Sequence, residues 1–316
     1  MKIIVDITKS RIQTDNPELL EALYQLYSYK IPGSEYSAAY KSHRWDGKQH
    51  FISRSGIFRT GLLRSVVENL KKIECTPEVE YLYTKENSYN PYIIENFSFY
   101  EFQEELIKKA LENQRGVIKA PTGSGKTLIM AALVKALAGK KTVILFNAKQ
   151  LLKQTYEFLT EECNLDNIGL CFGEGYIYGD CILCTVQSID KILETHLQET
   201  EVLMVDECHE FCKGKVTLPA IQSFPNAKYR FGFTATPPSE NIAKYSLEGA
   251  LGEILQVVNT SELIEQNKLS KPIIQLIDRE YTCSGIDEDM AYLDIYENYI
   301  INNKDRNNQI KDIVND

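Results

Sequence analysis

A glycine-rich segment, Ala120-Pro-Thr-Gly-Ser-Gly-Lys-Thr127, has the residue types that bind phosphate groups. Its two glycines allow the backbone to curl so that N–H groups point at phosphate oxygens. Lys126 can reach the β- and γ-phosphates of a nucleotide, and the Thr127 hydroxyl can bind Mg²⁺. Ala120 replaces the first glycine of the general pattern. The expected ligand is ATP with Mg²⁺, bound by Ala120, Pro121, Thr122, Gly123, Ser124, Gly125, Lys126 and Thr127.

Two acidic residues follow the apolar run Val202–Val205. Asp206 can hold Mg²⁺ together with Thr127, and Glu207 can orient and deprotonate an attacking water. On its own, an acidic pair at a strand end is often only a helix cap. Next to a phosphate loop, it predicts that Glu207, Asp206 and Lys126 are catalytic.

A third polar cluster, Thr234-Ala-Thr-Pro237, ends the next apolar run. The hydroxyls of Thr234 and Thr236 could hydrogen-bond to His209 or Glu207 and pass a nucleotide signal onward. The alternative is a plain strand ending before two prolines, which occurs in any fold.

The elements that position these residues alternate between short apolar runs and amphipathic stretches. The expected strands are Gly116–Ala120, Thr142–Asn147, Cys181–Val186, Val202–Val205 and Tyr229–Thr234. The expected helices include Lys126–Ala138, Lys149–Cys163 and Ser188–Thr195. This alternation predicts an α/β fold, in which helices cover both faces of a parallel sheet. Ligands of such sheets bind at the carboxyl ends of the strands, where all three motifs fall.

The 316 residues predict more than one domain. Residues 1–85 mix short strands with helices over Pro17–Tyr29, capped by Asp15 or Asn16, and Gly61–Lys72, and we expect a small α+β accessory domain. Residues 86–97 are polar and proline-containing and predict a linker. Residues 98–270 form the expected ATP-binding domain, and residues 271–316 contain a strand and a helix.

Bulk composition excludes several classes of protein. The net charge of -9 argues against a polybasic protein that binds nucleic acid through its overall field. Cys181 and Cys184 would point to opposite faces of a strand, so they cannot share a zinc ion. No apolar stretch is typical of a signal peptide or a membrane span. We expect a cytoplasmic protein with free thiols and no membrane partner.

The motifs, in order, resemble those of the superfamily 2 helicases. Gly-Ser-Gly-Lys-Thr127, Asp-Glu-Cys-His209 and Thr-Ala-Thr-Pro237 resemble motifs I, II and III. The resemblance implies a RecA-like fold, adenine recognition by Gln103, and coupling of nucleotide state to nucleic acid by His209, Thr234 and Thr236. Segments 147–154 and 179–188 resemble motifs Ia and Ic, which implies backbone contacts by Lys149, Gln154, Thr185 and Gln187. Taken singly, Lys149 and Gln154 are ordinary exposed helix residues.

The N-terminal segment resembles the accessory domain of UvsW-like phage helicases, through His43-Arg-Trp-Asp-Gly-Lys48 and residues 56–63. Such helicases unwind and branch-migrate junctions, D-loops and stalled forks. Residues 40–72 contain eight Lys or Arg and two acidic residues, a local charge of +6 in an acidic chain. Such a field attracts DNA of any sequence. The expected DNA contacts are Arg44, Trp45, Lys48 and Arg59.

Trp45 has two interpretations. Its ring could stack on bases or wedge into a junction, or it could belong to the core, with Asp46-Gly47 as a hairpin turn.

The resemblance implies an ATP-dependent DNA helicase or translocase of recombination and repair that acts on branched or double-stranded DNA. We expect a monomer that works beside recombination proteins. If the protein is phage-encoded, we expect it in the host cytoplasm. The alternatives are a duplex translocase subunit of a restriction or remodelling complex, and a DNA-binding module that senses nucleotide without turnover. The family carries an arginine finger on a second RecA-like domain, and the sequence lacks its Q-x-x-G-R-x-x-R pattern. We therefore expect these 316 residues to be a truncated chain that hydrolyses ATP slowly by itself.

Overall fold

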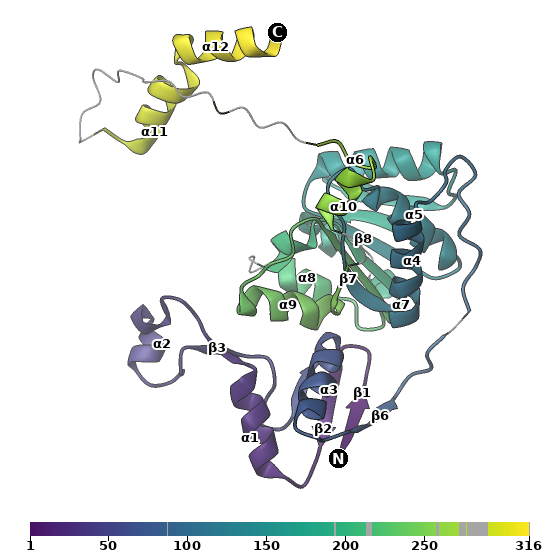
Figure 1. Cartoon of the computed structure of the whole chain (residues 1–316), viewed down its shortest axis with the longest axis vertical. Helices are drawn as coiled ribbons and strands as arrows, with labels where there is room; N and C mark the ends of the chain where they lie inside the picture. The colour runs from purple at the N-terminus through teal and green to yellow at the C-terminus, as the bar shows by residue number, and fades with distance from the viewer. Residues whose placement is uncertain are drawn as a thin grey trace. The chain divides into compact units, whose positions relative to one another are not determined.

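The computed structural model describes residues 1–86, 88–192, 194–212, 217–256, 259–271, 276 and 290–315. Contacts divide the chain into two compact units, residues 1–270 and residues 271–316. The first unit contains every candidate site residue. It consists of an N-terminal segment with its own small sheet, followed by a large sheet with helices around it (Figure 1).

The large sheet has eight strands in the order β10-β9-β11-β8-β12-β13-β7-β14. All neighbours are parallel except β10 and β9, which are antiparallel. The strands are β7 (Arg115–Lys119), β8 (Thr142–Phe146), β9 (Ile168–Phe172), β10 (Gly175–Ile177), β11 (Cys181–Thr185), β12 (Val202–Val205), β13 (Tyr229–Thr234) and β14 (Ile254–Leu255). The predicted α/β class, with a parallel sheet flanked by helices, is confirmed.

Helices cover both faces of this sheet (Figure 1). The helices are α4 (Glu101–Asn113), α5 (Lys126–Ala136), α6 (Lys149–Glu157), α7 (Glu194–Glu199), α8 (Thr217–Gln222), α9 (Asn241–Leu251) and α10 (Thr260–Glu265). Residues of α4, α5 and α6 pack in one hydrophobic cluster, and residues of α8 and α9 pack in another. Cys181 belongs to the first cluster and Cys184 to the second, as the alternation of side chains along a strand requires.

The expected elements of the large sheet match those observed, with one exception. The predicted helix Ser188–Thr195 is wrong, because a 3₁₀ segment occupies Val186–Lys191 and α7 starts at Glu194. Thr185 and Ser188 bond to each other through their hydroxyls in this turn, which gives the polar side chains partners outside a regular helix.

The N-terminal segment forms a mixed four-stranded sheet in the order β5-β2-β1-β6, in which only β1 and β6 are parallel, and a separate two-stranded sheet of β3 and β4. Its elements are β1 (Lys2–Val5), β2 (Lys9–Gln13), α1 (Pro17–Leu26), β3 (Ser28–Lys30), α2 (Ala38–Lys41), β4 (Lys48–His50), β5 (Ile57–Arg59), α3 (Leu63–Lys72) and β6 (Glu78–Tyr81). Asn16, one of the two predicted caps, accepts the Leu19 N–H at 3.0 Å. A separate apolar cluster around Ile3, Tyr27 and Val66 supports this segment.

The segment between the two sheets packs against the large one. No helix or strand occurs among the described residues from 82 to 99. Tyr89 donates its hydroxyl to the Leu111 carbonyl at 2.6 Å, and Asn90 N–H donates to the Ala136 carbonyl at 3.0 Å. Ile94 is buried in the core beside α4. The stretch expected to be a linker therefore runs along the large domain.

The second unit contains α11 (Tyr292–Ile295), a π-helical turn over Tyr296–Ile301 and α12 (Lys304–Asn315). The strand predicted over 272–277 lies outside the described residues, apart from Leu276. Among the described helices of the chain, none has the length and apolar character that crossing a membrane requires.

The N-terminal segment contacts the large domain at a point of close backbone approach. Gly61, in the 3₁₀ turn Thr60–Leu62, lies against α9. A Cβ atom placed on Gly61 would lie 2.0 Å from the Glu248 carbonyl oxygen and 2.7 Å from that of Gly249. Arg64 forms an ion pair with Glu253 nearby. Only glycine fits at position 61 without moving backbone.

We expect Gly61→Ala to lower the free energy of unfolding by about 1–3 kcal/mol, because the added methyl group forces two backbones apart. Thermal unfolding measures the effect. Gly175→Ala is the matched control, since its Cβ would meet nothing closer than 3.6 Å. Equal melting temperatures for the two variants would contradict the close contact.

Candidate active site

The phosphate loop lies at the carboxyl end of β7 and leads into α5. Gly123 and Gly125 have φ angles of +80° and +82°, which glycine adopts without the steric cost of a Cβ atom. Ser124 closes the turn, because its N–H and its hydroxyl both donate to the Pro121 carbonyl, at 3.2 and 2.7 Å. Lys126 is the first residue of α5, so the loop and the helix N-terminus can both face a phosphate group.

Gln103, predicted to recognise adenine, packs against the phosphate loop and hydrogen-bonds to it. The side chain is 2% exposed. Its amide N–H donates to the Ser124 carbonyl at 2.8 Å, and its carbonyl oxygen accepts the Tyr100 N–H at 2.8 Å. A Cβ atom on Gly125 would lie 2.5 Å from the Gln103 nitrogen. The amide has one further lone pair and one further N–H beyond these two bonds, and adenine recognition stays a prediction.

A chain of polar side chains joins the loop to the next two strand ends. Lys126 Nζ lies 3.5 Å from Glu207 Oε1, and Glu207 Oε2 lies 3.4 Å from His209 Nδ1. The same His209 nitrogen hydrogen-bonds to Thr234 Oγ1 at 2.8 Å. Thr236 donates its backbone N–H to Thr234 Oγ1 at 3.1 Å. Of the two interpretations of Thr234-Ala-Thr-Pro237, this geometry supports the one in which the motif contacts the acidic residues, through the Thr234 hydroxyl.

Two features of the backbone position Thr234 and Glu207 beside the phosphate loop. Ala120 N–H donates to the Thr234 carbonyl at 3.1 Å, which ties the start of the loop to the end of β13. Glu207 has a φ angle of +44°, a left-handed conformation that costs energy in a residue with a Cβ atom. This turn directs the Glu207 carboxylate toward Lys126 and His209.

Asp206 is a half-buried acid that has no cation in direct contact among the residues that the structure describes. Burial and, to a smaller extent, the Glu207 charge raise its pKa to about 6, against a hydrogen bond from the Glu207 N–H and the attraction of Lys126. A partly desolvated carboxylate of this kind favours a bound cation. Asp206 and the Thr127 hydroxyl offer oxygen atoms, which are the ligands that Mg²⁺ prefers. The residues therefore fit the predicted metal.

The predicted nucleic-acid contacts of the large domain divide into two groups. Lys149, Gln154 and Gln187 are exposed near the carboxyl ends of β8 and β11. Thr185 is 6% exposed and donates its hydroxyl to Ser188 Oγ at 3.0 Å. Thr185 therefore holds the turn after β11, and the structure does not place its side chain on the surface.

Sequence reasoning missed two features of this edge. Lys149 and Lys153 both place their amines over the Phe172 ring, at 4.9 and 5.7 Å from its centre. Their spacing of four residues on an exposed helix face was a usable signal. Asn147 donates its amide N–H to Glu210 at 2.8 Å and so connects the β8 end to the acidic motif. No local pattern indicates that pair.

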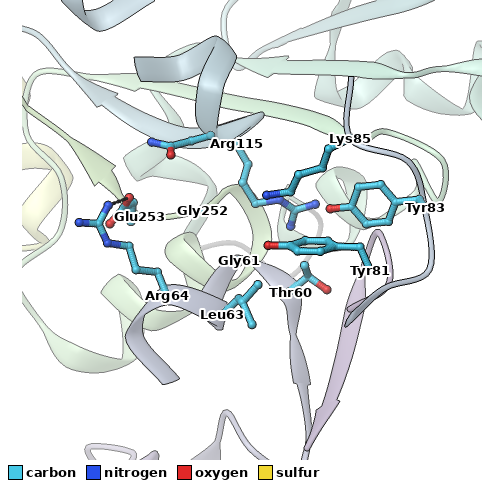
Figure 2. Close-up of a pocket in the computed structure, with 11 residues that line it drawn as sticks. Thr60, Gly61, Leu63, Arg64, Tyr81, Tyr83, Lys85, Arg115, Gly252 and Glu253 are labelled. Carbon is cyan, nitrogen blue, oxygen red and sulfur yellow. Dashed lines mark hydrogen bonds and ion pairs between the residues drawn. The ribbon is translucent and has the colours of Figure 1, made fainter. Parts of the chain in front are cut away.

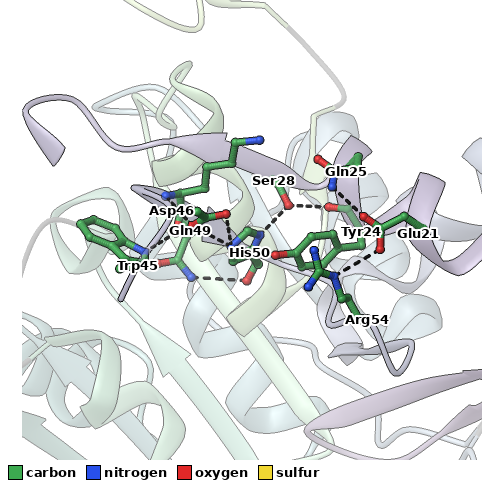
Figure 3. Close-up of polar contacts among 10 residues, drawn as sticks. Glu21, Tyr24, Gln25, Ser28, Trp45, Asp46, Gln49, His50 and Arg54 are labelled. Carbon is green, nitrogen blue, oxygen red and sulfur yellow. Dashed lines mark hydrogen bonds and ion pairs between the residues drawn. The ribbon is translucent and has the colours of Figure 1, made fainter. Parts of the chain in front are cut away.

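The accessory residues form a polar network around His50 (Figure 3). His50 Nδ1 lies 2.6 Å from Ser28 Oγ, and His50 Nε2 lies 3.2 Å from Asp46. Asp46 also accepts the Lys48 N–H at 3.1 Å, and the Trp45 indole N–H donates to the Lys48 carbonyl at 3.0 Å. Trp45 is half-buried and lies outside the apolar cluster of this segment.

The hairpin interpretation of Asp46-Gly47 is wrong. Lys48 starts β4, whose partner β3 ends at Lys30, so residues 31–47 form the whole connection. The Asp46 side chain forms a turn at the entrance to β4, and Gly47 supplies a φ angle of +77°. Trp45 and Lys48 are thus held together by hydrogen bonds of this turn.

Tertiary ion pairs reduce the predicted basic field. Arg54 pairs with Glu21 at 3.2 Å, and Arg64 pairs with both Glu68 and Glu253. Arg59 is half-buried against Gly249 and does not lie with Arg44, Trp45 and Lys48. The exposed cations of residues 40–72 that form no ion pair with a described residue are therefore fewer than the sequence count, and they include Lys41 and Arg44 near the end of α2.

We expect Asp206→Asn to raise the melting temperature in the absence of Mg²⁺ and nucleotide. A folded pKa raised from 3.8 to about 6 means that the folded protein keeps the proton to higher pH than the unfolded chain does. The carboxylate therefore destabilises the fold increasingly between pH 3.8 and about 6, and fully above that range. The increase in melting temperature of the variant over the unchanged protein should grow across the same pH range. Asp190→Asn, at an exposed position, is the control, and a pH-independent difference for Asp206→Asn would contradict the prediction.

The comparisons with known proteins agree with this geometry. Residues 96–239 match the family described as "Type III restriction enzyme, res subunit". The ATP-dependent DNA helicase uvsW of Enterobacteria phage T4 is 23% identical over 87% of this chain and 59% of its own length. The DNA 3'-5' translocase XPB2 of Sulfurisphaera tokodaii is 28% identical over 60% of this chain and 43% of its own length. The chain therefore spans about half the length of these curated relatives.

A crystal structure of the UvsW helicase from bacteriophage T4 superimposes with a TM-score of 0.65 at 19% identity, over 81% of this chain and 99% of that chain. A second T4 UvsW structure gives a TM-score of 0.64 at 20% identity, over 83% of this chain and 58% of that chain. These likenesses support the fold. Motifs, site geometry, fold and sequence similarity agree with one another, and in each of them the chain resembles the superfamily 2 helicases.

Proposed function

We propose that this chain is the ATP- and DNA-binding part of an ATP-dependent DNA helicase or translocase that acts on branched DNA in recombination and repair. The observation that carries the proposal is the polar chain from Lys126 through Glu207 and His209 to Thr234. It connects the phosphate loop to two other strand ends of the same sheet edge. A nucleotide at the loop would therefore change contacts at all three.

The side chains suggest an order of events at this edge. In the structure, Lys126 donates to the Ala120 carbonyl and forms an ion pair with Glu207. A phosphate group is a stronger partner for an ammonium ion, so ATP would draw Lys126 away and free Glu207. Glu207 could then accept a proton from the attacking water. Mg²⁺, bound by Thr127 and Asp206, would neutralise charge on the phosphates.

The freed Glu207 also changes the partners of His209. His209 Nδ1 is shared between Glu207 and Thr234, so a moved carboxylate alters the hydrogen bonding of Thr234 and, through it, of Thr236. Asn147 bonds to Glu210 in the same motif and precedes α6, which carries Lys149 and Lys153. These hydrogen bonds would connect the nucleotide at the phosphate loop with the exposed cations that would contact DNA.

The accessory segment supports a DNA substrate. Lys41 and Arg44 are exposed and form no ion pair within the described part of the chain, and Lys48 lies beside the half-buried Trp45. Cations near an exposed aromatic edge suit a nucleic-acid backbone with an adjacent base. A phage relative of this chain is named a DNA helicase, and the extension to branched DNA rests on the resemblance of residues 43–48 and 56–63 to the accessory domain of UvsW-like helicases.

Two other functions make different predictions. A duplex translocase would move along DNA without separating its strands, as the named activity of the XPB2 relative suggests. A nucleotide-sensing module would bind ATP and DNA without turnover. Strand-separation and ATPase assays on the intact protein distinguish all three.

We expect Glu207→Gln to keep ATP binding and to lower DNA-stimulated ATP hydrolysis by the intact protein about 10²–10⁴-fold, because the variant loses the proton acceptor. Glu210→Gln is the matched control in the same motif, with a smaller loss, since Glu210 contacts Asn147 and not Lys126. Near-normal turnover of the Glu207 variant would remove this residue from the role of base.

We expect the double variant Arg44→Ala, Lys48→Ala to weaken binding of this chain to a four-way junction and to lower the salt dependence. Each lost phosphate contact reduces the slope of log affinity against log salt by about 0.9. Arg11→Ala, an exposed position on another strand, is the control. Unchanged slopes would exclude this surface from DNA binding.

A further inference from the structure

Four cationic side chains meet at a cavity on the sheet edge opposite the phosphate loop. The cavity has a volume of about 280 Å³, and Lys9, Arg59, Arg115 and Arg230 line it together with Gln222. Arg115 and Arg230 lie at the amino ends of β7 and β13, whereas the phosphate loop and Thr234 lie at the carboxyl ends. At about 3.3 Å per residue along a strand, the two sites are well separated.

These cations come from both halves of the first unit. Lys9 and Arg59 are direct cross-strand partners in the β2–β5 pair, so both extend from the same face of the small sheet. Arg115, Arg230 and the backbone of Gly249 belong to the large domain. A ligand in the cavity would therefore contact the accessory segment and the motor sheet together.

Only some of the positive charge is satisfied by the protein. Arg230 donates to the carbonyls of Ala227, Ile221 and Phe224, and Arg115 donates to the Ile7 carbonyl at 2.8 Å. The side chains of Lys9 and Arg59 have no hydrogen bond or ion pair with any described residue.

The nearby acidic side chains do not neutralise the positive charge of the cavity. Glu253 pairs with Arg64, and Glu248 lies 3.9 Å from Lys244. Burial lowers the pKa of Arg59, and burial with the charges of Arg115 and Arg59 lowers the pKa of Arg230 to about 9. Like charges held together in a partly buried place are costly unless an anion joins them.

The surroundings of Arg115 extend the positive surface. A smaller neighbouring pocket, lined by Tyr81, Tyr83 and Lys85, shares Arg115 with the cavity (Figure 2). Lys85 places its amine over the Tyr81 ring, 4.2 Å from the ring centre, and this pocket adds Lys85 and the Glu253-paired Arg64 to the cations of the interface.

We propose that Lys9, Arg59 and Arg115 form a binding site for a phosphate group, which clamps the accessory segment to the motor sheet. A water takes up about 30 Å³, so the cavity has room for a tetrahedral oxyanion with several waters. Guanidinium groups bind phosphate through paired N–H donors. The phosphate is either a free ion or part of a nucleic-acid backbone, and the site does not depend on the proposed helicase activity.

The test is equilibrium dialysis of the 316-residue chain against radiolabelled inorganic phosphate, in a Lys126→Ala background that weakens binding at the phosphate loop. Arg59→Met keeps the aliphatic stem against Gly249 and removes the charge. We expect this second change to weaken the remaining phosphate binding by about tenfold or more, as loss of a charged hydrogen bond does. Arg54→Met, at an exposed arginine paired with Glu21, should leave it unchanged.

Lys9→Met provides an independent check at an exposed position, where a loss of folding is not expected, and should also weaken binding. Equal phosphate binding with and without Arg59 and Lys9 would overturn the proposal. Displacement of the bound phosphate by a short DNA duplex would assign the site to a nucleic-acid backbone, and retention would assign it to the free ion.

Discussion

The parallel arrangement of β7, β12 and β13 is the constraint on which the active site depends. Parallel strands end at the same edge, so Lys126, Glu207 and Thr234 meet although more than a hundred residues separate the first from the last. The Ala120 N–H bond to the Thr234 carbonyl continues the ladder into the loop itself. Buried apolar strands hold this register, because a slip would move hydrophobic side chains out of both clusters.

Buried polar groups make the loop and the sheet edge rigid. Gln103 uses both ends of its amide, one to cap α4 and one to hold the Ser124 carbonyl, so the position of α4 sets the shape of the loop. At the opposite edge, Arg230 satisfies three carbonyl groups that would otherwise be buried without partners. The same sheet therefore has a polar support at each end.

Near each edge of the large sheet lies a charged side chain that lacks an ion-pair partner among the described residues. Asp206 is a half-buried acid and Arg59 a half-buried cation, and neither has a direct counter-ion in the described part of the chain. A cation suits the first place and an anion suits the second. Both raise the energy of the unliganded protein, which is the expected cost of a prepared binding site.

The sequence by itself determined the features that depend on local pattern. Alternating apolar runs and amphipathic stretches predicted the parallel sheet and most of its elements, and the spacing within Gly-Ser-Gly-Lys-Thr127 and Asp206-Glu207 predicted the phosphate loop and the acidic motif. Motif order predicted that the hydroxyls of Thr234 and Thr236 could meet His209 or Glu207. These properties follow from strand and helix periodicity and from the fixed direction of parallel strands.

Only the tertiary structure decided which polar side chains are free. Thr185 is buried against Ser188, Arg54 and Arg64 are paired with acids distant in sequence, and Arg59 points into an interface. Counting charges in a window cannot reveal such partners, because burial and ion pairing join residues that the chain brings together only after folding.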